Sequence, residues 1–444
     1  MPNDVVSNTD YKEGEKMFLK LLCVLALVPM ILFAKAGSLD GSFGETGIVK
    51  EDIFGQTDDE LRDIVIQNDG KIIAVGVIQD NAAYKGAIVR FNTDGSIDKS
   101  FGNDGKVIKS INGNQITSFG SVKLLSDGEI IVGGYTAHSS GGGEDSMLMR
   151  FDNNGTLDKS FGNAGVIIED IGKGYSDTIS DIAIQTDGKI VTAEYGVASG
   201  GKCNFALARY DVNGTLDTSF GIQGIVITTF PEQKYCSESV AIQMDEKIIV
   251  SGGDWEDGTE FVLVRYDSNG SIDENFGDKG KIVSELGYGY GDARALKIQS
   301  DGRIVVAGGT LYDTLMRFDR DGKPDPAFGE GGMVKTQIQG YVRGLDIQKN
   351  GKIVAVGGSS NFIVVRLDTN GSFDNLFGIK GVVSTNVGGN HDKAFSVSLQ
   401  SDGKIVVGGF NFDFAANDID FVLVRYIGDY LPSSVLSPIY YLLD

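Results

Sequence analysis

The chain has 444 residues and a formal net charge of −22, and apolar residues make up 41% of it. Such a chain can bury a large core, and it is not collagen-like, because its 62 glycines follow no three-residue period. The negative charge argues against nucleic acid as a partner, because a phosphate backbone binds to basic surfaces.

The first 36 residues differ from the rest. Residues 1–16 are hydrophilic and acidic, and an unbroken apolar run from Leu21 to Phe33 leads to Ala34-Lys35-Ala36. The run is too short to span a bilayer and precedes a small-x-small cleavage site, so residues 1–36 are predicted to be a secretory signal peptide. Because a signal peptide begins with positive charge, we expect the true start to be Met17. An uncleaved N-terminal anchor is the alternative.

Export would place the mature protein outside the cell, in the periplasm or at the cell surface, with no membrane span after cleavage. Cys23 lies inside the predicted signal, which leaves Cys203 and Cys236 in the mature chain. In an oxidising compartment these two cysteines could form a disulfide, and two separate thiols are the alternative.

An internal repeat occupies the chain from residue 37 onward. A Phe-Gly step recurs at spacings of 49 to 60 residues, and each unit also carries an Asp-Gly-Lys-like turn and an apolar-apolar-Arg segment. The repeated phenylalanines are Phe43, Phe101, Phe161, Phe220, Phe276, Phe328 and Phe377, and the repeated arginines are Arg90, Arg150, Arg209, Arg265, Arg317, Arg366 and Arg425.

Each unit predicts four short strands, which we term a, b, c and d. In the first unit they cover Ile48–Ile53, Ile64–Gln67, Ile72–Val77 and Ala87–Phe91, which are rich in Val and Ile. No segment of the mature chain has a sustained helical period. Seven four-stranded repeats predict an all-β fold, a seven-bladed β-propeller, with an open β-solenoid as the competing architecture.

The pattern Asp-Gly-Lys-Ile-Val-x-Gly-Gly, followed by Leu-Val-Arg-Tyr-Asp-x-Asn-Gly-x-Leu-Asp-x-Ser-Phe-Gly, resembles the delta-60 repeat family of secreted bacterial propellers. The resemblance covers the predicted propeller, residues 37–426, and implies its fold and export, but it implies no activity and no catalytic residues. The chain departs from the pattern after Tyr426, where no Phe-Gly step follows. We expect the C-terminal tail, residues 427–444, to pack across the closure of the ring.

Connection lengths divide the two faces of the predicted ring. Each of the first six repeated arginines precedes the next Phe-Gly step by 11 residues, whereas the c-to-d connections vary in length. Because antiparallel strands alternate in direction, the d-to-a and b-to-c connections share one face, here called the repetitive face. The a-to-b and c-to-d connections share the other, the individual face.

Unusual residues gather on the individual face. Aromatic side chains beside carboxylates suit a protein or carbohydrate ligand at the cell surface, whereas ordinary glycine-rich loops that cover blade edges are the alternative reading. The candidates for an interaction face are Trp255, Tyr288, Tyr290, His391, His138 and Tyr175.

The d-to-a connections are rich in side-chain oxygen atoms, which could bind a calcium ion. Their Asp-x-Asn-Gly-x-x-Asp spacing suits a Ca²⁺ ion, although side chains that cap tight turns explain it equally. The candidates are Asp152, Asn154 and Asp158, and the equivalent Asp211, Asn213 and Asp217. No other cofactor is indicated.

The sequence contains no motif of a serine hydrolase, a zinc protease or a nucleotide-binding loop. The leading expectation is therefore a monomeric, exported binding scaffold that engages a protein or glycan through its individual face. A hydrolase or lyase with paired carboxylates in the central channel is the alternative, and a structural protein of the cell envelope is the third reading.

Overall fold

The computed structural model describes residues 35–429, except for the loops at 56–57, 81–82, 112–115, 138–142, 172–175, 199–201, 231–234, 255–259, 286–291, 310–312 and 414–417. The described residues form 28 strands in seven four-stranded antiparallel sheets. The seven-bladed β-propeller predicted from the repeats is confirmed. These residues form no helix, and therefore none that is long and apolar enough to cross a membrane.

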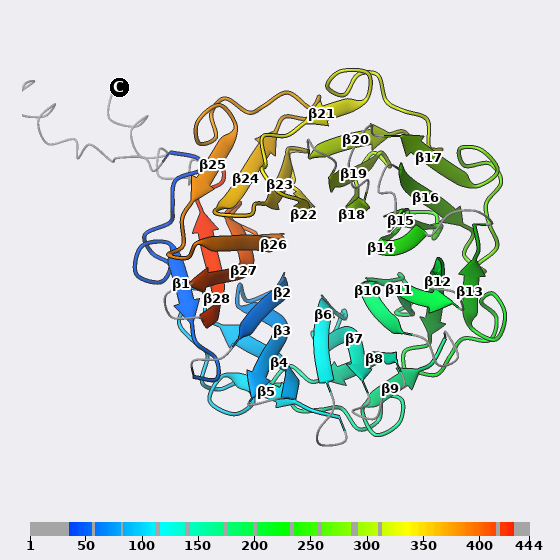
Figure 1. The fold of residues 1–444 in the computed structure, drawn as a ribbon, viewed down its shortest axis with the longest axis horizontal. Coiled ribbons are helices and arrows are strands. Elements are labelled where there is room, and N and C mark those ends of the chain that lie inside the picture. The colour runs from blue at the N-terminus through cyan, green and yellow to red at the C-terminus, as the bar shows by residue number, and fades with distance from the viewer. Residues whose placement is uncertain are drawn as a thin grey trace, which may run out of the picture. The chain divides into compact units, whose positions relative to one another are not determined.

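The strands lie in four concentric positions around the ring (Figure 1). The innermost strands are β2 (Asp59–Ile66), β6 (Ile116–Leu124), β10 (Asp177–Ile184), β14 (Tyr235–Ile242), β18 (Asp292–Ile298), β22 (Val342–Ile347) and β26 (His391–Leu399). The second strands are β3 (Ile72–Asp80), β7 (Ile130–Ala137), β11 (Ile190–Ala198), β15 (Ile248–Asp254), β19 (Ile304–Gly309), β23 (Ile353–Gly357) and β27 (Ile405–Asp413). The third strands are β4 (Ala83–Phe91), β8 (Glu144–Phe151), β12 (Lys202–Tyr210), β16 (Glu260–Tyr266), β20 (Thr314–Phe318), β24 (Phe362–Leu367) and β28 (Asp418–Tyr426). The outermost strands are β5 (Lys106–Lys109), β9 (Val166–Glu169), β13 (Ile225–Thr228), β17 (Lys281–Glu285), β21 (Met333–Lys335), β25 (Val382–Thr385) and β1 (Ile48–Glu51).

The core lies between the blades. Residues 72–75 of β3 are completely buried, because both faces of this strand meet a neighbouring sheet. In one inter-blade cluster, Phe205 and Leu207 of β12 pack with Val250 and Val264 of the next blade. Burial on both faces explains why the second strands are continuous runs of Val, Ile and Ala rather than alternating patterns.

The repeat is displaced by one strand from the blade. Strands a to d of one sequence unit do not form one sheet. Strand β1 pairs with β28 at the other end of the chain, through Ile48↔Val424, and not with β2. Each d strand instead pairs with the a strand that follows it, as β4 does with β5. A repeat of four strands can be divided starting from any one of them, so the sequence does not show where a blade begins. Only the hydrogen-bonded pairing of the strands defines which four belong to one blade.

The displacement also explains the missing Phe-Gly step after Tyr426. The N-terminal segment supplies that step, because the guanidinium of Arg425 lies 4.5 Å from the ring centre of Phe43. Its Nε donates to Asp40 Oδ2 at 2.8 Å. From the tail, Asp429 forms an ion pair of 2.8 Å with Arg366, while residues 430–444 lie outside the described part of the chain.

The predicted b strand is too short at its start. Strand β2 begins at Asp59, ahead of the predicted Ile64, and its pairing with β3 shifts register between Leu61 and Asp63. This β-bulge leaves Arg62 between two buried apolar residues, Leu61 and Ile64, and interrupts the alternation on which strand prediction depends.

A disulfide joins two neighbouring blades. Cys203 of β12 and Cys236 of β14 are bonded, with a Cα–Cα distance of 5.1 Å. The two alternatives left open by the sequence therefore resolve to the disulfide in this structure.

A candidate binding ring in the central channel

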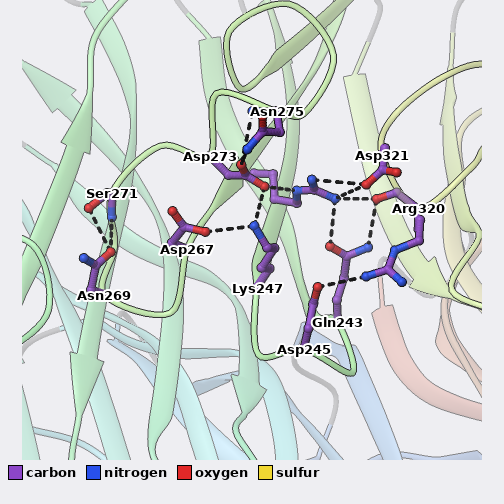
Figure 2. Close-up of polar contacts among 11 residues, drawn as sticks. Gln243, Asp245, Lys247, Asp267, Asn269, Ser271, Asp273, Asn275, Arg320 and Asp321 are labelled. Carbon is purple, nitrogen blue, oxygen red and sulfur yellow. Dashed lines mark hydrogen bonds and ion pairs between the residues drawn. The ribbon is translucent and has the colours of Figure 1, made fainter.

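The repetitive face is built from repeated structural contacts (Figure 2). Arg265 of β16 donates through Nε to Asp273 Oδ2 at 2.7 Å, and its guanidinium lies 4.7 Å from the ring centre of Phe276. Lys247, from the b-to-c turn, forms an ion pair of 2.6 Å with the same Asp273. The guanidinium also donates to the backbone carbonyl of Arg320 in the next blade. We call this arrangement the arginine latch.

The Arg, Asp and Phe of the latch recur in every blade, with a guanidinium 4.5 to 4.9 Å from the centre of a phenylalanine ring. Its ion pairs are Arg90–Asp98, Arg150–Asp158, Arg209–Asp217, Arg265–Asp273, Arg317–Asp325, Arg366–Asp374 and Arg425–Asp40. The glycine that follows each phenylalanine has a left-handed backbone; at Gly221, φ is 53° and a Cβ would meet the carbonyl oxygen of Ile225 at 2.3 Å. The repeated residues are thus structural.

The calcium candidates take part in these turns and latches. Asp152 Oδ1 accepts hydrogen bonds of 2.8 Å from the backbone N–H groups of Asn154 and Thr156. Asp158 Oδ2 accepts from Arg150 Nε at 2.7 Å. Asp211, Asn213 and Asp217 repeat the pattern. No group of three His, Cys, Asp or Glu side chains within the described ranges could hold a metal ion. The geometry favours turn capping, and calcium binding stays an untested prediction.

Most of the aromatic interaction candidates cannot be placed. Trp255, Tyr288, Tyr290, His138 and Tyr175 lie outside the described residues. His391, at the start of β26, is exposed, and its Nδ1 lies 3.0 Å from the carbonyl oxygen of Ser359.

A cavity of about 590 Å³ occupies the central channel and is lined by residues from all seven innermost strands. Each of these strands shifts register in its pairing with the second strand, and the bulge places one residue of each blade in the cavity lining. We call these residues the bulge ring: Arg62, Gly120, Ser180, Glu238, Arg294, Arg343 and Phe395. Unlike the latch residues, the ring residues are not of the same type in every blade. Bulges commonly re-aim side chains beside functional sites.

The bulge ring is asymmetric. Arg294, Arg343, Phe395 and Arg62 come from four successive blades, whereas the small residues Gly120 and Ser180 come from the other side of the ring. A second cavity of about 340 Å³ touches all seven ring residues and also Ser118, Tyr135 and Thr178. A charged wall therefore faces an open wall that carries hydroxyl groups.

Aromatic rings hold the arginines. The guanidinium of Arg343 lies 4.6 Å from the ring centre of Phe395, and that of Arg62 lies 5.1 Å from the same ring. The guanidinium of Arg294 lies 4.4 Å from the ring centre of Tyr341. Such stacking is favourable and fixes the plane of a guanidinium.

The ring arginines differ in their partners. Arg294 forms an ion pair of 2.7 Å with Asp292, and Arg62 pairs with Glu60. The buried Nε atoms of Arg294 and Arg343 both lack a hydrogen-bond partner among the described residues, and Arg343 also has no acidic partner within 4 Å there. A buried donor without an acceptor is costly, so Arg343 is poised to bind a ligand oxygen.

Burial and neighbouring charges shift the pKa values of two ring residues. Burial, together with the nearby charges of Arg294 and Arg62, lowers the pKa of Arg343 to about 10. Burial raises the pKa of Glu238 to about 7, against the opposing effect of Arg294. Perturbed ionisable groups that face a cavity are typical of functional sites.

A layer of hydrogen bonds beside the ring fixes the inner strands. Asp63 Oδ1 accepts from Ser396 Oγ at 2.6 Å in one neighbouring blade, and Oδ2 accepts from the N–H of Val122 at 3.0 Å in the other. Asp181 likewise accepts from Lys123 Nζ at 3.0 Å and from the N–H of Val240 at 3.1 Å. Because these bonds cross between blades, they set the relative positions of the ring residues.

Sequence reasoning missed the bulge ring. Arg62 and its equivalents lie before the predicted b strands and belong to no repeated motif. One signal could have found them: apolar residues three apart, such as Leu61 and Ile64 or Ile179 and Ile182, enclose a position that varies from blade to blade.

The fold and the bulge ring define this protein as a seven-bladed β-propeller with an arginine-lined central channel. It belongs to the β-propeller family described as a domain of unknown function (DUF5122), whose model matches residues 67–101, 125–161, 185–220, 243–276, 299–328, 348–377 and 400–426. No curated protein matches the chain.

Solved structures of propellers are similar to it at low identity. A protein of unknown function from Dyadobacter fermentans is 10% identical, with a TM-score of 0.48, and the match covers 86% of this chain and 99% of that one. A Penicillium chrysogenum α-L-arabinanase in complex with arabinobiose is 12% identical, with a TM-score of 0.44, covering 90% and 98%. A gluconolactonase from Xanthomonas campestris is 10% identical, with a TM-score of 0.37, covering 67% and 90%. At these values, none of the three supports a statement about ligand or activity.

Proposed function

We propose that this protein is a binding module that receives its ligand in the central channel from the individual face. The bulge ring carries this proposal, because the seven blades place five different types of residue around one cavity. A sevenfold repeat supplies seven equivalent positions, and a unique site needs positions that differ. The ring meets that requirement, whereas the arginine latches are repeated.

The position of the smaller cavity supports entry from the individual face. Thr178 lies near the start of β10 and Tyr135 near the end of β7. These strand ends adjoin the a-to-b and c-to-d connections. The cavity therefore extends toward the face on which the candidate residues Trp255, Tyr288 and Tyr290 were predicted.

We further propose that the protein is exported and that its repeats are of the delta-60 type. The apolar run before Ala34-Lys35-Ala36 supports export, and so does the disulfide between Cys203 and Cys236, because disulfides persist in oxidising compartments. Mass spectrometry of the secreted protein should find Gly37 at its N-terminus. An intact N-terminus on membrane-bound protein would contradict cleavage.

Catalysis in the channel is the second candidate function, and Glu238 is the observation that favours it. With a pKa of about 7, this carboxyl group exists in both protonation states at neutral pH and can donate or accept a proton. A hydrolase or lyase would use it as a general acid or base.

A binding assay on immobilised glycans and a cross-linked pull-down from the cell envelope would test the binding function. The full-length chain would be compared with a ring variant, Arg62→Gln with Arg343→Gln, and with a loop variant that replaces Trp255, Tyr288, Tyr290 and His391 by Ser. Arg320→Gln is the matched control, because this arginine is 63% exposed on the repetitive face.

Capture that is lost in the folded ring variant and kept in the control supports the proposed site. Loss in the loop variant alone would move the site to the loops, and capture by every variant would refute the channel site. Turnover of glycosides or lactones that disappears in Glu238→Gln would favour the enzyme. If neither capture nor turnover is observed, a structural role in the cell envelope remains as the third hypothesis.

A further inference from the structure

The bulge ring is richer in positive side chains than the molecule as a whole. The whole chain carries a net charge of −22, yet the ring has three arginines and one glutamate. Arg62 and Arg294 each have a carboxylate partner on their own strand, whereas Arg343 has none within 4 Å in the described part of the chain. Glu238 lies near enough to interact with the charge of Arg343, but the two form no ion pair within 4 Å among the described residues, and burial raises the pKa of Glu238 to about 7. An anionic ligand would give the Arg343 guanidinium the direct partner that it lacks.

The geometry of the arginines suits a carboxylate. Stacking on Phe395 and Tyr341 occupies the faces of the guanidinium groups and leaves their N–H edges to form hydrogen bonds. The Nε of Arg343 is buried and has no acceptor among the described residues. A planar carboxylate can accept two parallel hydrogen bonds from such an edge, and the aromatic stacking arranges the group in advance.

The open wall indicates the rest of the ligand. Gly120 leaves space there, and Ser118, Thr178, Ser180 and Tyr135 line the same cavity. The hydroxyl of Ser180 donates to the carbonyl oxygens of Ala193 and Ser237, and that of Thr178 donates to Glu144. Each hydroxyl oxygen keeps lone pairs that can accept hydrogen bonds from a ligand body that itself carries hydroxyls. A volume of about 340 Å³ is in the range of small-molecule sites.

We propose that the bulge ring binds a small hydroxylated carboxylate, that is, a sugar acid, with Arg343 and its neighbouring arginines on the carboxylate and the hydroxyl-bearing wall on the sugar hydroxyls. This inference rests on the proposed binding function, and it names the ligand class of the same site.

Isothermal titration of the full-length protein with sodium D-glucuronate tests the inference. Three further probes dissect it: D-glucose lacks the carboxylate, acetate lacks the hydroxylated body, and inorganic phosphate is an anion of another shape. We expect glucuronate to bind at least about tenfold more tightly than each of the three. Equal affinity for glucose, acetate or phosphate would overturn the proposed class.

Substitutions assign the binding to the ring. Arg343→Gln should weaken glucuronate binding by at least about tenfold, and Arg343→Lys should restore only part of it, because a lysine cannot form the paired hydrogen bonds. The control Arg320→Gln makes the same change of charge on the repetitive face and should bind as the wild type does. Unchanged affinity in folded Arg343→Gln would overturn the inference.

A steric variant tests the site without removing charge. At Gly120, a Cβ would meet only the carbonyl oxygens of Ile179 at 3.5 Å and Gly133 at 3.9 Å, which are ordinary contacts. A first side-chain carbon therefore fits at this position. Gly120→Val, once shown to be folded by circular dichroism, keeps every arginine and obstructs the open wall, and we expect it to weaken glucuronate binding. If the wild type captures a glycan or protein but does not bind glucuronate, the sugar-acid proposal is refuted. The proposed binding function would still stand.

Discussion

Buried acidic side chains in this molecule are accommodated in two ways, by pairing with a cation or by protonation. In the arginine latch, Asp273 is paired with both Arg265 and Lys247, so its charge is compensated. Glu194 in β11 is fully buried and accepts a hydrogen bond of 2.6 Å from Thr192 and another from Ser146, with no cation among these partners. Burial raises the pKa of Glu194 to about 7, so the folded protein favours its neutral form.

Glu194 should make stability depend on pH. In the unfolded chain this carboxyl group loses its proton near its ordinary pKa of 4.5, but in the folded protein it does so near 7. Between these values the folded state binds more protons, so the contribution of Glu194 to stability falls as pH rises through this window. The fall should amount to about 3 kcal/mol.

Urea unfolding of the wild type and of Glu194→Gln at pH 5 and pH 8 measures this contribution. The variant should gain stability relative to the wild type on going from pH 5 to pH 8. Glu45→Gln, at an exposed position, should show no such gain. A pH dependence of Glu194→Gln identical to that of the wild type would contradict the assignment.

Between elements, the arginine latches join neighbouring blades. Each arginine binds an aspartate in its own blade, and six of the seven also donate to a backbone carbonyl of the next blade. Arg366 is the exception, since it pairs with the side chain of Asp429 after the last strand. The latches therefore connect neighbouring blades at repeated positions around the ring.

Removing one latch should be costly. Arg265→Gln leaves Asp273, which is 3% exposed, with Lys247 as its remaining cation, and breaks the bond to the next blade. We expect a loss of about 3 kcal/mol in the free energy of unfolding, measured with urea. The exposed Arg320→Gln should cost less than about 1 kcal/mol. Equal costs would show that the latch adds nothing beyond a surface ion pair.

Some structural elements could be predicted from the sequence and others could not. The arginines, phenylalanines and glycines of the latch recur in every unit, so counting them predicted seven blades correctly. The boundary of the blade could not be predicted, because β1 pairs with β28 only once the ring has formed. The bulge ring escaped prediction because Arg62 and Arg343 lie where a bulge breaks the alternating pattern, and because their proximity arises only from the closure of the ring.

For the molecule as a whole, closure depends on the N-terminal segment. Asp40, Phe43 and β1 complete the last blade, in which β28, β27 and β26 come from the other end of the chain. Every other blade is made of consecutive strands. Among the seven sheets of the described residues, the last blade is therefore the one whose completion joins distant parts of the chain.

Phe43→Ala should loosen this closure locally. Phe43 is completely buried, and truncation of a buried phenylalanine costs about 3–5 kcal/mol. Hydrogen exchange should increase first in β1 and in β26 to β28. The matched variant Phe220→Ala, equally buried, should increase exchange around β12 and β13 instead. An identical, ring-wide increase in both variants would show that the last blade is not a separate weak point.

The pairing of β1 with β28 has a consequence for biosynthesis. The ribosome makes β1 before any other strand of the propeller and β28 after all the others, so a growing chain carries an unpaired strand for almost the whole of translation. Exposed strand edges are templates for aggregation, which makes this the interval in which a chaperone is needed most. A chain terminated before β28 can never conceal that edge, and the edge gives proteases a means to distinguish unfinished molecules from complete ones.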